Sequence, residues 1–250
     1  MLSDGRCAVI YSLFDSAAAY EVTEADQAGP VPPIEAVLFD FSNTIFKLID
    51  VETWLRRIES ATGRELGPGL VEKTAEQLGE AYRVPEVAEA QIGRDESPTK
   101  HRIAMFEWFR RIDYLQGVEE TAYELIAAPD AWVPYPDTEP LLRELRRRGI
   151  KTGIVSDFAW DVGVHMAHHG LDDLIDVRVH SFQFETEKPD PVLFRAACEQ
   201  LDVDPRAALM VGDNPAKDGG AAASGLRAFI LPGEARTGER GLAHVLGFLD

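Results

Sequence analysis

Five short, continuously apolar segments are the feature of this 250-residue chain that most restricts its fold. Continuous apolar character is typical of strands covered on both faces, as in a parallel sheet. Amphipathic segments separate them, and one begins with Asp190 as the expected N-cap and Pro191 at the first helical position. This alternation predicts an α/β fold with a doubly wound parallel sheet. The expected strands are Ala36–Asp40, Ile150–Ser156, Val177–Ser181, Ala208–Gly212 and Arg227–Leu231.

The stretch from residue 47 to residue 135 has a different pattern, with few strand signals. We predict that residues 47–135 form a helical domain inserted after the first core strand, between core segments 34–46 and 136–250. Residues 1–33 are expected to be an N-terminal extension that ends in the stiff segment GPVPP, and its role stays open. The helices expected in the insertion are Val51–Ala61, Leu70–Tyr82, Thr99–Ile112 and Val118–Ala128.

The net charge and the cysteine content indicate which kinds of binding partner and which cellular compartment to expect. A net charge of −18 disfavours nucleic-acid backbones and anionic membrane surfaces, so we expect a small-molecule substrate and no nucleic acid or membrane partner. No apolar run approaches the roughly 20 residues that a membrane span needs. The two cysteines, Cys7 and Cys198, make no disulfide framework, which favours a cytoplasmic protein. The oligomeric state stays open.

Polar residues follow several of the expected strands at the point where each strand ends. In an open parallel sheet, ligands bind beyond the carboxyl ends of the strands. Taken singly, each of these residues is an ordinary helix cap, turn residue or surface charge. Their common position predicts a site at one edge of the sheet. The residues expected there are Asp40, Ser156, Lys188, Asp213 and Asp218.

Four motifs, in this order along the chain, resemble those of the haloacid dehalogenase-like (HAD) hydrolase superfamily. They are LFDFSNT at 38–44, GIVSD at 153–157, EKPDPVLF at 187–194 and MVGDNPAKD at 210–218. The resemblance extends from about Ile34 to Leu231. It implies a Rossmann-like core, and the helical insertion stands where the family's type-1 cap domain belongs.

The resemblance also implies roles for the residues at the strand ends. Asp40 would be the nucleophile and form an aspartyl intermediate with the substrate. Ser156 would donate a hydrogen bond to a phosphoryl oxygen, and Lys188 would supply a positive charge. The cofactor would be Mg²⁺, and its implied ligands are Asp40, the backbone carbonyl of Ser42, Asp213 and, directly or through water, Asp218.

Further substrate contacts are expected around the first motif and in the insertion. Backbone N–H groups around Ser42, Asn43 and Thr44 would bind phosphoryl oxygens. Asp157 is expected beside the substrate, since it follows Ser156. In the insertion, His101 and Arg57 are the candidates for residues that face the substrate, while the neighbouring aromatic residues are expected to form the core of the insertion.

Ser42 departs from the family pattern, because most phosphatases of the family carry a second Asp there. That Asp protonates the leaving group and later activates water, and losing such a group typically costs ~10²–10⁴ in rate. Four interpretations stay open. The leaving group needs no proton, an insertion residue such as His101 supplies one, the bond cleaved is carbon–halogen, or turnover is slow or absent.

We therefore predict a Mg²⁺-dependent phosphohydrolase of small phosphorylated metabolites, with two alternatives. The first is a metal-independent 2-haloacid dehalogenase, since family dehalogenases also lack the second Asp. They usually carry an aromatic residue at the Ser42 position, however, and the intact pair Asp213 and Asp218 favours a metal. The second alternative is a weakly active or non-catalytic binding protein.

Overall fold

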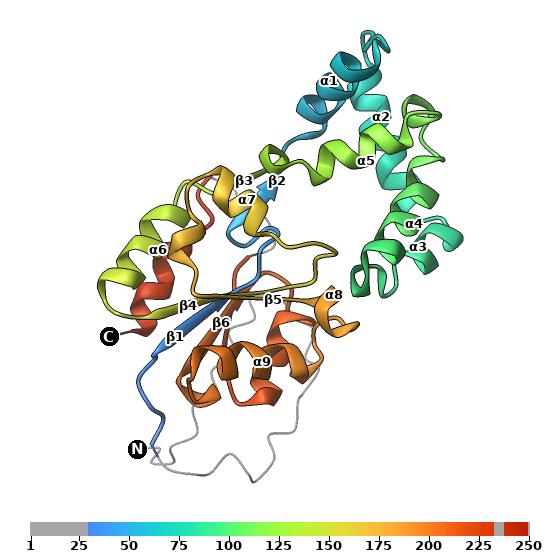
Figure 1. The fold of residues 1–250 in the computed structure, drawn as a ribbon. Helices are drawn as coiled ribbons and strands as arrows, with labels where there is room; N and C mark the ends of the chain where they lie inside the picture. The colour runs from blue at the N-terminus through green and yellow to red at the C-terminus, as the bar shows by residue number, and fades with distance from the viewer. Residues whose placement is uncertain (1–29, 233–237, 250) are drawn as a thin grey trace, which may run out of the picture.

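The computed structural model describes residues 30–232 and 238–249, so most of the predicted N-terminal extension, with Cys7, lies outside the described residues. Figure 1 shows two groups of elements. One is a sheet with helices on both faces, and the other is a group of helices, from α1 to α5, at the upper right of the view.

The sheet has five strands, all parallel, in the order β5-β4-β1-β6-β7. Strand β1 lies at its centre, where Phe39 pairs with Ile154 on one side and Val211 on the other. This confirms the predicted doubly wound α/β fold. Both ends of each strand lie within one residue of the predicted positions. The strands are β1 (Ala36–Phe39), β4 (Lys151–Ser156), β5 (Val177–His180), β6 (Ala208–Gly212) and β7 (Arg227–Ile230).

Both faces of the sheet are buried, which explains the continuous apolar character of its strands. Val37 and Phe39 of β1 belong to a core that includes α6 (Thr138–Arg147), α7 (Gly163–His168) and the 3₁₀ helix η8 (Leu242–Phe248). Ala36 and Leu38 point to the opposite face and pack with α9 (Pro191–Leu201).

Helix α9 begins as the sequence predicts. The Asp190 carboxylate accepts the N–H of Val192 at 2.9 Å, and Pro191 occupies the first turn. The segment after β6, which is rich in Gly and Ala and ends at Gly225, forms the 3₁₀ helix η7. The remaining short elements of the core are η5 (Asp172–Leu174), α8 (Ser181–Phe184), η6 (Pro205–Ala207) and η7 (Asp218–Ser224).

The helices from α1 to α5 form a helical insertion with its own apolar core, built around Trp54, Leu55, Ile58 and Phe109. Helix α2 has the predicted bounds, whereas α4 ends at Phe109 rather than at Ile112. A short helix, α3, was not predicted. The elements of the insertion are α1 (Val51–Thr62), α2 (Leu70–Tyr82), α3 (Pro85–Ala90), η2 (Arg94–Glu96), α4 (Pro98–Phe109), η3 (Asp113–Leu115), α5 (Glu119–Ala127) and η4 (Pro129–Ala131).

A two-stranded antiparallel sheet lies where the chain enters and leaves the insertion. Its strands are β2 (Phe46–Leu48) and β3 (Trp132–Pro134), and Lys47 pairs with Val133. Strands of three residues are too short to give a periodic signal, so the sequence did not predict them. The division into domains at residues 47 and 135 stays a prediction.

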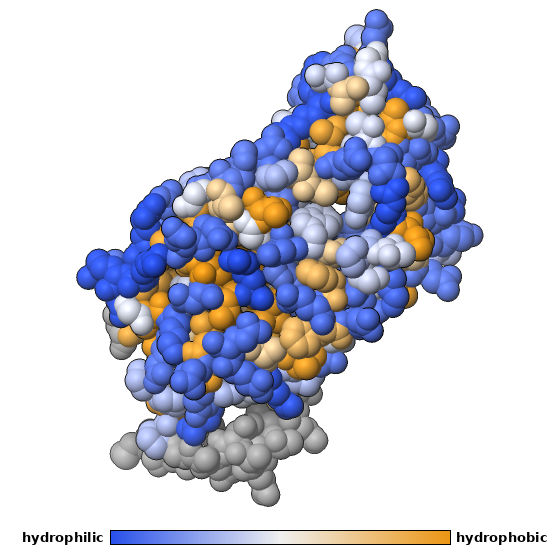
Figure 2. All heavy atoms as spheres, viewed as in Figure 1, coloured by the Kyte–Doolittle hydropathy of each residue, from blue (hydrophilic) through white to orange (hydrophobic). Residues whose placement is uncertain are grey.

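Hydrophilic residues cover most of the face in Figure 2, with small apolar areas between them. In the part of the chain that the structure describes, no helix is both long and apolar enough to cross a membrane.

Candidate active site

Three neighbouring strands bring the predicted residues together at their carboxyl ends. Asp40 directly follows β1, and its N–H donates to the carbonyl of Val211 in β6 at 2.9 Å. Ser156 ends β4, and its hydroxyl donates to Asp40 Oδ1 at 3.3 Å. Residues 116 positions apart therefore meet because their strands are adjacent in the sheet.

Lys188 connects two of the carboxylates. Its Nζ lies 2.7 Å from Asp40 Oδ1 and 2.6 Å from Asp218 Oδ1, and its side chain is almost fully buried. Burial alone would lower the pKa of Lys188, but the carboxylates of Asp218 and Asp40 outweigh it and raise the pKa. The lysine is therefore a fixed positive charge beside Asp40.

Asp40, Asp213 and Asp218 form an acidic cluster in which one oxygen of each lies within 4.8 Å of the others. Burial raises the pKa of Asp40 to about 7, against the opposing effect of Lys188, and the nearby Asp218 and Asp213 add to the rise. Burial, with Asp218 beside it, also raises the pKa of Asp213. Lys188 pairs with two of these three carboxylates, so the cluster holds more negative charge than the lysine offsets.

Two local features hold Asp218 in the cluster. Its Oδ2 accepts the N–H of Asn214 at 2.9 Å. A Cβ at Gly212, the last residue of β6, would lie 2.2 Å from the Asp218 carboxyl carbon, so only glycine leaves room for this carboxylate.

The loop after β1 turns tightly within a few residues. Asn43 has a φ of 55°, and its N–H donates to Phe46 O at 2.7 Å, while the N–H of Thr44 points to Phe41 O at 3.4 Å. Among the described residues, the N–H groups of Phe41 and Ser42 have no backbone acceptor. They are the amides of this loop that can donate to an anion.

The side chains of this loop differ in their surroundings. The Thr44 hydroxyl lies 3.4 Å from Asp40 Oδ2 and is fully buried, whereas Ser42 is half-buried. Arg240, which the sequence did not single out, donates from Nε to the carbonyl of Asn43 and is buried. Nothing in its sequence context, after a Gly-rich loop, pointed to this contact.

Asp157 has both carboxylate oxygens engaged by the protein. Oδ1 accepts the backbone N–H of Lys188 at 2.9 Å, and Oδ2 lies 2.8 Å from the Nζ of Lys217. Lys217 also pairs with Glu187 at 3.1 Å. Neither Lys217 nor Glu187 was predicted, although each directly precedes a predicted site residue in its motif.

His101 lies in α4, at the contact between the insertion and the core. Its Nδ1 is 3.0 Å from the Tyr123 hydroxyl, and its ring packs edge-on against Trp160 with 5.3 Å between centroids. Burial, with Arg94 nearby, lowers the pKa of His101 to about 3, so the imidazole is neutral at neutral pH. Its predicted role at the substrate stays a prediction.

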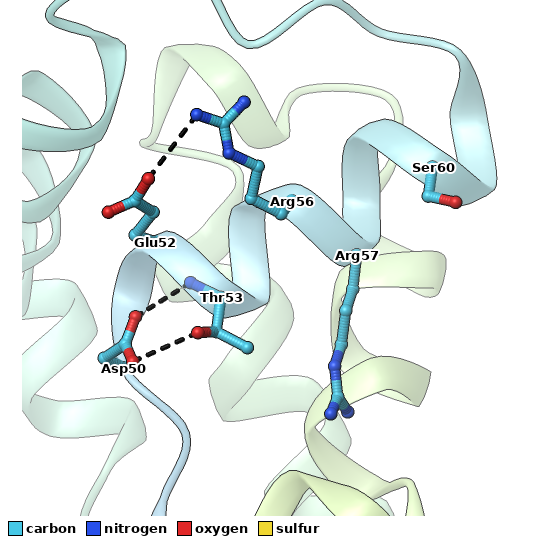
Figure 3. Close-up of a pocket in the computed structure, with 6 residues that line it drawn as sticks. All are labelled: Asp50, Glu52, Thr53, Arg56, Arg57 and Ser60. Carbon is cyan, nitrogen blue, oxygen red and sulfur yellow. Dashed lines mark hydrogen bonds and ion pairs between the residues drawn. The ribbon is translucent and has the colours of Figure 1, made fainter.

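Arg57 lies on α1 and pairs with Asp130 at 3.0 Å. Arg57 lines a pocket of about 450 Å³ together with Asp50 and with other residues of α1. Figure 3 shows its side chain extended away from Arg56 and Glu52. This pocket contains none of the acidic cluster, and its lining is exposed helix surface. Substrate binding by Arg57 stays a prediction that no contact with the cluster supports.

Comparison with known proteins gives consistent results for the fold. A family model described as haloacid dehalogenase-like hydrolase matches residues 34–225. Phosphatase MT3486 from Mycobacterium tuberculosis is 34% identical over 121 residues, which make up 46% of this chain and 56% of that protein. The chain thus spans about half the length of this curated relative.

Two solved structures resemble this one equally well but carry different activities in their names. An HAD phosphatase from Thermococcus onnurineus has 25% identity and a TM-score of 0.57, and the match covers 86% of this chain and 98% of that one. The L-2-haloacid dehalogenase from Xanthobacter autotrophicus also has 25% identity and a TM-score of 0.57, over 81% of this chain and 79% of that one. The similarity alone does not separate the two reactions, so the residues of the site must.

Proposed function

Because this chain belongs to the haloacid dehalogenase-like hydrolases, we propose that it is a Mg²⁺-dependent phosphohydrolase of small phosphorylated molecules, with Asp40 as the nucleophile. The observation that carries the proposal is the cluster of Asp40, Asp213 and Asp218, in which Lys188 pairs with Asp40 and Asp218. Three carboxylate oxygens this close together fit a divalent cation, and carbon–halogen cleavage needs no metal, so the cluster favours phosphoryl transfer.

The cluster fits a hard divalent cation. Its three donors are all carboxylate oxygens within 4.8 Å of one another, and carboxylates are ligands that Mg²⁺ prefers. Burial raises the pKa of Asp40 and of Asp213, and the neighbouring carboxylates add to the rise, which is the part that a cation would oppose. Asp40, Asp213, Asp218 and the carbonyl of Ser42 would hold the ion, which would neutralise the phosphoryl oxygens and favour the ionised form of Asp40.

The chain's own residues would then do the remaining work. The Asp40 carboxylate attacks phosphorus, a P–O bond to Asp40 forms, and the bond to the leaving oxygen breaks. Lys188 and the Ser156 hydroxyl, which both contact Asp40 Oδ1, stabilise the negative charge of the transferring group. The free N–H groups of Phe41 and Ser42 donate to the same oxygens. Water then attacks phosphorus, the P–O bond to Asp40 breaks, and the protons of the water leave with the phosphate, which restores the Asp40 carboxylate.

The proposal extends to the leaving group. Ser42 has no proton of suitable acidity to give, and the neutral imidazole of His101 is a weak acid at neutral pH. We therefore expect a substrate whose leaving group departs without protonation, such as an aryl or acyl phosphate. The relatives with phosphatase names support this reaction class and leave the substrate unassigned.

Hydrolysis of p-nitrophenyl phosphate by the purified chain tests the proposal. We expect turnover with Mg²⁺, at least a hundredfold less with EDTA, and none in Asp40→Asn. Asp173→Asn, which changes an exposed carboxylate, is the matched control and should keep full activity. Equal hydrolysis with Mg²⁺ and with EDTA would contradict the role of the metal.

A metal-independent dehalogenase is the second candidate, and Ser42 is the observation in its favour, because carbon–halogen cleavage needs no acid at the leaving group. It predicts halide release from 2-haloacids in EDTA. Absence of release over a panel of 2-chloro and 2-bromo acids would remove this candidate. If neither halide nor phosphate is released, a weakly active or binding protein becomes the better interpretation.

For the location, we keep the cytoplasm as our proposal. Cys198 is a free thiol buried in the core around α9, and burial raises its pKa to about 11, which makes it unreactive. A single buried thiol among the described residues is compatible with a reducing compartment.

A further inference from the structure

One contact of the helical insertion with the core is the short turn η2, which lies against α8 and the loop before Lys188. The contact is made by the backbone of Asp95. Its N–H donates to Glu187 Oε1 at 3.0 Å, and its carbonyl accepts the Ser181 hydroxyl at 2.5 Å. Residues of the core therefore bind both the N–H and the carbonyl of Asp95 in the insertion.

The core side of this contact leads directly to the catalytic lysine. Glu187 Oε2 pairs with Lys217 at 3.1 Å, and the same Nζ pairs with Asp157 at 2.8 Å. Asp157 in turn accepts the backbone N–H of Lys188 at 2.9 Å. Glu187 and Lys188 are also adjacent in the chain. The contacts of the Glu187 side chain and the contact of Asp157 with the Lys188 N–H therefore lie on neighbouring residues.

Lys217, Glu187 and Asp157 form a charged bridge that is largely shielded from solvent. The side chains of Asp157 and Glu187 are 7% and 17% exposed, so removing Lys217 would leave two sheltered carboxylates facing one another. Burial alone would lower the pKa of Lys217, but Asp157 and Glu187 raise it, which keeps the bridge charged. Exposed pairs such as Lys73 with Asp113 lack this shelter, since both side chains are 55% exposed.

We propose that Glu187 and Lys217 are positioning residues that fix the η2 turn of the insertion over the site and fix the backbone of Lys188 beneath it. Glu187 performs the first task through Asp95, and Lys217 performs the second through Asp157. The geometry of the bridge stands without any substrate, whereas its effect on turnover rests on the proposed function.

Amide hydrogen exchange at Asp95, followed by NMR, tests the bridge without any assay of activity. In Glu187→Ala the N–H loses a charged acceptor, and we expect exchange at Asp95 to accelerate about tenfold or more. Glu187→Gln keeps an acceptor oxygen and should change it less than threefold. Lys73→Met and Glu120→Gln break exposed pairs of the insertion and should leave Asp95 unchanged.

Kinetics separate the two tasks if the phosphatase proposal holds. Glu187→Ala should raise KM at least fivefold with kcat within threefold, because the insertion no longer rests on the site. Lys217→Met should lower kcat at least tenfold, because it also frees Asp157 and with it Lys188. A purely structural role would lower thermal stability in both variants without this division between KM and kcat.

Two results would overturn the proposal. One is unchanged exchange at Asp95 in Glu187→Ala. The other is an acceleration at Phe109, inside the insertion, as large as that at Asp95 in both Glu187→Ala and Lys217→Met, since the bridge would then maintain the fold of the insertion rather than its position. Absence of phosphatase activity in the wild type would overturn the proposed function and leave the exchange result standing.

Discussion

Burial and the neighbouring carboxylates disfavour the ionised form of Asp40. Its carboxylate lies at the end of a buried strand, near two other carboxylates, and burial raises its pKa to about 7. Lys188 and the Ser156 hydroxyl partly offset this at Oδ1. A carboxylate held in such a place is a reactive one, because a desolvated anion is a better nucleophile than one stabilised by water.

At the neighbouring position, Ser42→Asp should restore the acid that phosphatases of the family carry. We expect kcat for an alkyl phosphate to rise about tenfold or more, with the ~10²–10⁴ that a positioned acid supplies as the upper range. Hydrolysis of p-nitrophenyl phosphate should change less than threefold, since its leaving group needs no proton. Steady-state kinetics on both substrates provide the measurement.

The matched control for this experiment is Ser42→Asn, which has the size of the new side chain without its proton. It should not raise turnover of the alkyl phosphate. If Ser42→Asp fails in the same way, the missing acid is not what limits the enzyme.

Asp95 allows a prediction on pH and stability. Burial raises its pKa to about 6, from an ordinary 3.8, so the folded protein holds a proton that the unfolded chain has lost between those pH values. The stability that this carboxyl contributes is complete below pH 4 and is lost as the pH rises through 6. Asp95→Asn should therefore be more stable than the wild type by up to about 3 kcal/mol at pH 8 and by nearly nothing at pH 4.

Urea unfolding of both proteins between pH 4 and pH 8 measures this difference. The substitution leaves the backbone contacts with Glu187 and Ser181 unchanged, so the comparison isolates the carboxylate. Parallel pH curves for the two proteins would contradict the raised pKa.

At the scale of the secondary-structure elements, the end of β6 determines where Asp218 lies. A Cβ at Gly212 would come within 2.2 Å of the Asp218 carboxyl carbon, so Gly212→Ala should push that carboxylate out of the cluster. We expect at least a hundredfold loss of Mg²⁺-dependent activity and a higher Mg²⁺ concentration for half-maximal rate. Gly219→Ala, whose Cβ would meet nothing within 4 Å, is the control and should retain activity within about threefold.

The elements also show how far the sequence could predict this structure. The five strands of the sheet were predicted because each is buried on both faces and therefore continuously apolar. Strands β2 and β3 were missed because three residues give no periodic signal. Helix α3 was missed for a similar reason, since it has six residues between breaks at Pro85 and Gly93.

For the site, the sequence predicted the residues that follow strands and missed those whose role comes from pairing across the fold. The meeting of Asp40 with Lys188 was predicted, because the motifs occur in the family's order and ligands bind beyond the carboxyl ends of parallel strands. The bridge from Lys217 to Glu187 and Asp157 does not, because its three charges come from separate loops and each is an ordinary surface residue when taken alone.

At the scale of the whole molecule, the two apolar cores of the sheet and the separate core of the insertion place the site between two bodies. The insertion is joined to the sheet by β2 and β3 and by the contact at Asp95. Such an arrangement can cover a substrate while the acidic cluster stays fixed on the sheet. Under the proposed function, we expect the insertion to select the substrate and the sheet to process it, so the core motifs alone would not identify the substrate.

Because the chain has a net charge of −18, any salt should stabilise it by relieving repulsion among its carboxylates. A specific Mg²⁺ site must stabilise the protein beyond that general effect. With Mg²⁺ at a hundred times its Kd, binding to the folded state adds about 2.7 kcal/mol, which for a chain of this size is a rise in Tm of about 5 °C or more.

Thermal unfolding in MgCl₂ and in NaCl of equal ionic strength separates the two effects, because screening depends on ionic strength while coordination depends on the ion. We expect the larger rise with MgCl₂ in the wild type and equal rises in Asp213→Asn, which removes one carboxylate from the cluster but leaves the pairing of Lys188 with Asp40 and Asp218. Asp173→Asn removes the same charge from an exposed site and should behave as the wild type does. Equal rises in both salts for the wild type would mean that the three carboxylates hold no metal, and the dehalogenase reaction would then be the better interpretation of Ser42.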